Sequence, residues 1–79
     1  MRITEQERSN LIAIGKQLRG NRKLCNMTQA QVGEKLGVSG QQVCKYEYGI
    51  DQVSILLAIR YSEIFMKSLS ELFNLDGTI

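Results

Sequence analysis

The most informative part of the chain is residues 28–49, which read TQAQVGEKLGVSGQQVCKYEYG. It contains two short segments of helical periodicity, which the residues Gly-Val-Ser at 37–39 separate. Ser or Thr followed three residues later by Gln marks a helix start, because each side chain can cap a free backbone N–H of the other residue. That signature occurs at the start of both segments, so we predict helices over about 29–36 and 40–48, joined by a tight turn.

Two glycines explain how these helices can meet. Gly37 permits the positive φ that a sharp turn needs. Gly33 lies inside the first helix, where glycine costs up to about 1 kcal/mol relative to alanine. Its missing side chain lets the second helix cross closely over the first, and a merely tolerated glycine is the alternative explanation.

The second of these helices has two distinct faces at 100° per residue. Val43 and Tyr46 share one face, which we predict to be buried in the core. The other face presents an amide, an ammonium and a phenol, from Gln41, Lys45 and Tyr48. Gln can pair with adenine and Lys can donate to guanine in the major groove, so this face fits base readout. A polar face without a function is the alternative.

The same kinds of signal predict helix boundaries in the rest of the chain. Capping residues mark helix starts at Thr4, Thr28, Ser39, Ser54 and Ser68, and residues suited to the left-handed conformation mark stops at Asn26, Gly37 and Gly49. Further helices therefore extend over about 5–24, 54–65 and 69–73. No stretch alternates with period two for long enough to make a strand. We expect an all-α, compact five-helix domain over 1–79, with an N-terminal extension of the first helix at about 1–10.

Composition excludes several classes of protein. The 79 residues leave room for one small domain and contain no histidine, the commonest general base and metal ligand. The two cysteines, Cys25 and Cys44, are too few for a zinc site, and we expect both to be reduced. We therefore expect no enzyme activity, no metal and no cofactor. No signal core or membrane-length apolar run is present, so we expect a cytoplasmic, nucleoid-associated protein that does not bind membranes.

The net charge of +2 is distributed unevenly along the chain. Residues 16–46 carry six basic side chains and one acidic side chain, whereas residues 47–79 carry a net charge of −3. A basic segment of this kind suits a polyanionic partner. A solvated helical surface is the alternative explanation.

Residues 28–49 resemble the helix-turn-helix of the Xre family, which includes phage repressors and Cro. They match T-Q-x-x-[L/V]-[A/G]-x-x-x-G-[V/I/L]-[S/T]-x-x-x-[I/V]-x-x-[aromatic/aliphatic]-E-x-G at every fixed position, and the similarity covers roughly residues 11–73. The resemblance implies a lambda-repressor-like domain with its helix-turn-helix at 28–48. It also implies a sequence-specific transcriptional regulator, a repressor, which binds double-stranded DNA as a homodimer on a pseudo-palindromic operator.

The resemblance also assigns roles to individual residues. Base edges are read from three positions: Gly40, Gln41 and Lys45. Relatives usually carry a larger side chain at position 40, so one base contact is missing or replaced here. The DNA backbone is contacted by four residues: Thr28, Gln29, Ser39 and Tyr48. Gln29 also braces the recognition helix, and Arg22 and Glu47 form a structural, partly buried ion pair between the first and third helices.

Departures from the family pattern favour a second function. Asp51 places negative charge where relatives are basic, and Leu56 and Leu57 add apolar surface. The alternative is therefore an antitoxin-like or other protein-interaction module with weakened DNA binding and an unidentified protein partner. Apolar residues near the C-terminus are candidates for the dimer face, or for simple core: Leu69, Leu72, Phe73, Leu75 and Ile79.

Overall fold

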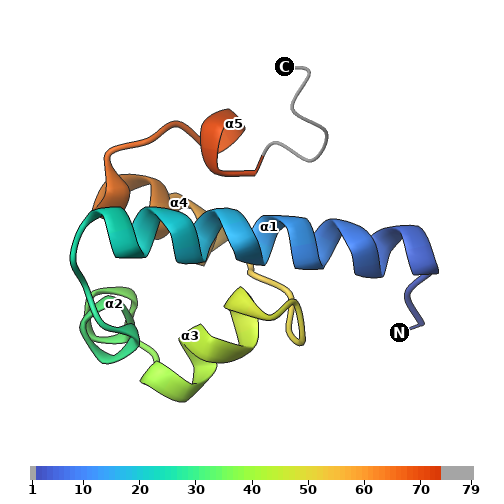
Figure 1. Cartoon of the computed structure of the whole chain (residues 1–79), viewed down its shortest axis with the longest axis horizontal. Coiled ribbons are helices and arrows are strands. Elements are labelled where there is room, and N and C mark those ends of the chain that lie inside the picture. The colour runs from blue at the N-terminus through green and yellow to red at the C-terminus, as the bar shows by residue number, and fades with distance from the viewer. Residues whose placement is uncertain (1, 74–79) are drawn as a thin grey trace.

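The computed structural model describes residues 2–73, and it consists of five α-helices around one core (Figure 1). The helices are α1 (Glu5–Leu24), α2 (Gln29–Leu36), α3 (Gly40–Glu47), α4 (Ile55–Phe65) and α5 (Leu69–Leu72). In Figure 1, α1 runs along the long axis, with α2 and α3 below it, α4 behind it and α5 above. The all-α class and the five predicted helices are confirmed, and no strand occurs in the described residues.

Side-chain caps fix where the helices begin. The capping boxes of α1, α2 and α5 are closed in both directions, as predicted. Ser54 caps α4 by accepting the backbone N–H of Leu57 at 3.2 Å. Ser39 caps α3 through the N–H of Gln42 at 3.0 Å, but the Gln42 side chain donates to Asp51 at 2.8 Å instead of returning to Ser39. The prediction of a full capping box at α3 is therefore wrong, because a tertiary partner takes the Gln42 amide.

Residues in the left-handed conformation end the helices. Asn26, Gly37 and Gly49 have φ angles of 55°, 86° and 70°, which confirms the three predicted stops. Met66 also has a φ of 55° and ends α4. This stop could not be predicted, because methionine has no preference for the left-handed region.

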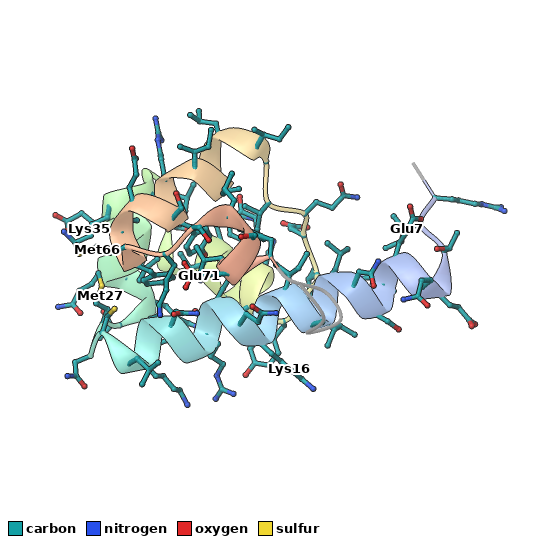
Figure 2. The ribbon with its side chains drawn as sticks, turned by 90° about the horizontal axis from the view of Figure 1, so that it is seen from above. Glu7, Lys16, Met27, Lys35, Met66 and Glu71 are labelled. Carbon is teal, nitrogen blue, oxygen red and sulfur yellow. The ribbon has the colours of Figure 1, made fainter. Side chains whose placement is uncertain are left out.

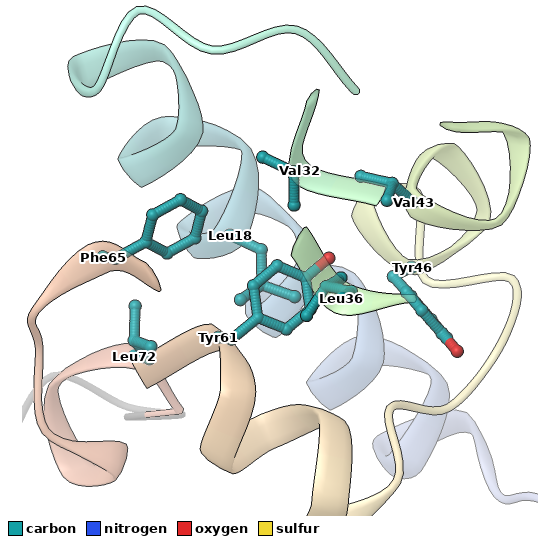
Figure 3. Packing of buried hydrophobic residues seen from close by; sticks show 8 residues of the cluster. All are labelled: Leu18, Val32, Leu36, Val43, Tyr46, Tyr61, Phe65 and Leu72. Carbon is teal, nitrogen blue, oxygen red and sulfur yellow. The ribbon is translucent and has the colours of Figure 1, made fainter. Parts of the chain in front are cut away.

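The core lies where α1 faces the other helices (Figure 3). It contains eight buried side chains: Leu18, Val32, Leu36, Val43, Tyr46, Tyr61, Phe65 and Leu72. The ring centroids of Tyr61 and Phe65 are 5.6 Å apart. On α4, Nη1 of Arg60 donates to the carbonyl of Leu36 at 2.8 Å, so this side chain ties α4 to the C-terminal end of α2.

The apolar residues near the C-terminus have different environments. Leu72 is fully buried and Phe73 packs against the core, so core is the correct explanation for both. Leu69 is 44% exposed and remains available at the surface. Leu75 and Ile79 lie outside the described residues.

Two close approaches hold the helix-turn-helix in place. A Cβ on Gly33 would lie 2.6 Å from the carbonyl oxygen of Val38, so the chain does approach Gly33 closely, but the contact is made by the turn before α3 and not, as predicted, by α3 itself. A Cβ on Gly15 of α1 would lie 2.7 Å from the carbonyl oxygen of Tyr46 and would overlap the carbonyl group of Glu47. This second crossing, of α1 with the end of α3, was not predicted. Figure 2 shows that the N-terminal part of α1, which carries Glu7, projects beyond the other helices.

Candidate nucleic-acid interface

The second helix of the helix-turn-helix, α3, buries one face and exposes the other. Val43 is fully buried, and Tyr46 is 8% exposed. Gln41, Lys45 and Tyr48 are all exposed, Tyr48 to 58%. The predicted division of α3 into a core face and a polar outer face is therefore confirmed. The structure brings the three polar side chains together on one side of α3, where a partner can reach them.

The hydroxyl groups of Thr28 and Ser39 mark the N-terminal ends of α2 and α3. Oγ1 of Thr28 accepts the N–H of Gln31 at 3.1 Å, and Oγ of Ser39 accepts the N–H of Gln42 at 3.0 Å. Each hydroxyl uses only a lone pair in its cap, so its proton can still be donated to an anion. The N-terminal ends of helices also attract anions through their free N–H groups.

Gly40 begins α3 and packs against α2. A Cβ on Gly40 would lie 3.1 Å from both the backbone nitrogen and the Cα of Ala30. The Cβ of a larger residue at this position would therefore point toward α2 and press against its backbone. Any contribution of Gly40 to base readout must come from its backbone.

A shared carboxylate ties α3 to α1 and α2. Nε of Arg22 donates to Oε2 of Glu47 at 2.6 Å, and Nη2 donates to Oε1 at 3.2 Å. Nη1 of Arg22 donates to the carbonyl of Met27 at 2.9 Å. Nε2 of Gln29 donates to Oε1 of Glu47 at 3.2 Å. The predicted ion pair is therefore present, and the Gln29 side chain braces the end of α3.

Arg22 and the nearby Tyr61 have raised pKa values. The hydrogen bond that Arg22 donates to Glu47, together with the negative charge of that carboxylate, raises the pKa of Arg22 above its ordinary value. Burial raises the pKa of Tyr61, and the charge of Glu47 raises it further, so this phenol stays neutral. Oη of Tyr61 is the one buried side-chain polar atom without a hydrogen bond in the part of the chain that the structure describes.

The loop after α3 is held from two sides. Nη1 of Arg8 in α1 donates to the carbonyl of Gly49 at 2.5 Å. From α3, Gln42 donates to Asp51, and the carbonyl of Lys45 accepts the N–H of Ile50 at 2.9 Å. Sequence reasoning missed Arg8, because its partner is 41 residues away and no local pattern connects the two.

Other kinds of site find no support among the described residues. Within residues 2–73, no group of three or more His, Cys, Asp or Glu side chains could hold a metal ion. None of the described helices combines the length and the apolar character that crossing a membrane requires. Two open surface pockets, of about 220 and 350 Å³, are lined by residues other than those on the outer face of α3.

Known proteins share this arrangement. The restriction-modification controller protein C.AhdI of Aeromonas hydrophila has the same fold, with a TM-score of 0.75 and 24% identity over 80% of this chain and 96% of that chain. Two uncharacterised HTH-type transcriptional regulators of Sinorhizobium fredii are similar in sequence. The first, y4aM, is 48% identical over 42 residues, which cover 53% of this chain and 29% of y4aM. The second, y4wC, is 45% identical over 40 residues, which cover 51% of this chain and 28% of y4wC.

This chain thus spans less than a third of the length of either of these two relatives. A family model described as a helix-turn-helix matches residues 18–72, which is more than half of the chain. That range includes the turn, the exposed face of α3 and both members of the ion pair. The chain belongs to the Xre-like helix-turn-helix family.

Proposed function

We propose that this protein is a sequence-specific DNA-binding transcriptional regulator, a repressor, which occupies a pseudo-palindromic operator as a dimer. The proposal rests on the outer face of α3, where Gln41, Lys45 and Tyr48 are exposed. The opposite face of α3 is packed in the core, which holds the helix in place. A helix of this kind can enter the major groove, where Gln pairs with adenine and Lys donates to guanine. The names of the two Sinorhizobium relatives support a role in transcription.

We propose that residues around the outer face of α3 contact the DNA backbone. The hydroxyls of Thr28 and Ser39 donate to phosphates at the starts of α2 and α3, while Tyr48 lies against the backbone near the other end of α3. Gln29 has two amide protons. One is directed to Glu47, and the other remains for a phosphate oxygen. These contacts set the register of α3 in the groove, and the base contacts supply the specificity.

The exposed face of α4 supports dimerisation. Ile55, Leu56 and Ile59 are 81%, 57% and 42% exposed, and their spacing places them on one side of the helix. A contiguous exposed apolar patch marks an interaction surface in a soluble domain. In Figure 1, α4 lies behind α1 and α3 lies below α1, so the two helices occupy different parts of the molecule. Leu57 is different, because it packs against the core.

A selection from random DNA, together with the molecular mass in solution, tests the proposal. We expect enrichment of a sequence with two related half-sites about one helical turn apart, the mass of a dimer, and affinity that falls steeply with salt. No enrichment at low salt would contradict DNA binding. It would favour the antitoxin-like interaction module, which could also use the apolar face of α4.

A further inference from the structure

The loop that follows α3 brings a carboxylate back alongside this helix. Asp51 is half-buried, and its Oδ2 accepts a hydrogen bond from Nε2 of Gln42 at 2.8 Å. The backbone N–H groups of Ile50 and Asp51 both point to the carbonyl of Lys45, at 2.9 and 3.4 Å. The chain is therefore folded against the last turn of α3, and the Asp51 carboxylate is fixed beside the helix that carries Gln41 and Lys45.

The bond from Gln42 orients this carboxylate without neutralising it. Gln42 is a neutral amide donor, and the part of the chain that the structure describes contains no ion pair to Asp51. At α1, α2 and α5 the corresponding third residue of the helix turns back to close its capping box. At α3 the side-chain amide of Gln42 donates to Asp51 instead. This hydrogen bond keeps the negative charge of Asp51 close to the helix.

We infer that Asp51 limits the affinity of this protein for DNA, because Gln42 holds its negative charge close to the phosphates that flank α3. The inference rests on the proposed function. Like charges several ångströms apart in water repel enough to change affinity a few-fold for each phosphate. A repulsion of this size weakens binding by one copy, and stable occupancy of an operator then depends on both copies of a dimer.

Asp51→Asn tests this inference, because the new amide oxygen can still accept the bond from Gln42. We expect about three- to tenfold tighter binding to a selected operator duplex at low salt, with a smaller gain at high salt. Glu5→Gln is the matched control, since it removes the same charge from an exposed position at the start of α1, outside the helix-turn-helix and the apolar face of α4. It should change the affinity less than about twofold. No gain from Asp51→Asn, or equal gains from both variants, would overturn the inference.

A double-mutant cycle tests the role of Gln42. Gln42→Met removes the amide donor but keeps a side chain of similar length. If Gln42 holds the carboxylate near the DNA, Asp51→Asn gains less affinity in the Gln42→Met background than in the parent. An undiminished gain would show that Gln42 does not position the charge.

The same measurements separate this inference from the proposed function. If the parent protein binds DNA and Asp51→Asn does not improve binding, only the inference fails. If neither protein binds any duplex at low salt, the proposed function fails and the inference fails with it. Thermal melting followed by circular dichroism verifies that each variant is folded.

Discussion

Arg22 and Glu47 lie 25 residues apart in the sequence, and their side chains form an ion pair with an Nε to Oε2 distance of 2.6 Å. The carboxylate of Glu47 is 1% exposed and also accepts a bond from Gln29 of α2. One buried carboxylate at the end of α3 is therefore bonded to both α1 and α2. Water cannot easily replace these partners, so the orientation of α3 depends on them.

The first prediction concerns the removal of Arg22. Arg22→Ala leaves the buried carboxylate of Glu47 without its charged partner, and we expect the free energy of unfolding to fall by about 3–5 kcal/mol. Arg19→Ala removes the same residue type from an exposed position on the same helix, and should cost less than about 0.5 kcal/mol. Urea denaturation at neutral pH measures both. Equal losses would show that Glu47 does not depend on Arg22.

The second prediction concerns base readout by α3. Gln41→Ala and Lys45→Ala should each lose about 1–3 kcal/mol of discrimination at a single base pair. Both side chains are exposed, so neither change should alter the fold. Binding to single-base variants of a selected operator measures the discrimination. A variant with unchanged selectivity would remove that residue from the readout.

The helix-turn-helix could be predicted from the sequence because its determinants are local. Capping pairs such as Thr28 with Gln31, and the left-handed Gly37, involve residues only a few positions apart. The ion pair between Arg22 and Glu47 is not local, and it was expected only through the resemblance to a family. The local rule failed at Gln42, where Asp51 competed successfully for the amide.

Contacts that depend on how the helices cross could not be predicted. Arg8 donates to Gly49 and Arg60 donates to Leu36 across 41 and 24 residues. Each bond exists because two helices meet at a certain angle, and a single sequence carries no pattern for that angle. Gly15 was missed for the same reason, since its backbone contacts lie at the far end of the helix-turn-helix.

The third prediction concerns this crossing of α1 with the end of α3. Gly15→Ala places a methyl group against the backbone of Tyr46 and Glu47, which cannot move without shifting α3. We expect the free energy of unfolding to fall by about 1–3 kcal/mol or more. Gly20→Ala is the matched control, because nothing lies within 4 Å of its new methyl group.

The control should gain up to about 1 kcal/mol, because alanine is the better helix former. Thermal and urea denaturation of the two variants measure the difference. A stabilising effect of Gly15→Ala would mean that α1 and α3 do not approach each other this closely in solution.

The fourth prediction concerns the apolar face of α4. Ile55→Glu places a charge where a second copy is proposed to bind, so we expect the dimer to dissociate into folded monomers. Leu24→Glu is the matched control, since Leu24 is also 81% exposed but lies at the end of α1. Light scattering measures the mass of each variant. If both variants remain dimers, the dimer forms through another surface.

The last prediction concerns the buried hydroxyl of Tyr61. This hydroxyl has no hydrogen-bond partner among the described residues, so Tyr61→Phe removes an unsatisfied polar group without leaving a large cavity. We expect the free energy of unfolding to rise by about 1 kcal/mol at neutral pH. A loss of stability would show that the hydroxyl has a partner in solution.

The pH dependence of Tyr61→Phe gives a second measurement. Burial raises the pKa of Tyr61 in the folded state above its ordinary value of 10.0, so the folded protein holds this proton more tightly than the unfolded chain. The stability linked to this proton is complete below about pH 10 and is lost as the pH rises toward the folded-state pKa. The advantage of Tyr61→Phe over the parent should therefore grow between pH 7 and about pH 10.5. Urea denaturation of the parent and of Tyr61→Phe at both pH values measures this growth, and an equal advantage at the two values would contradict it.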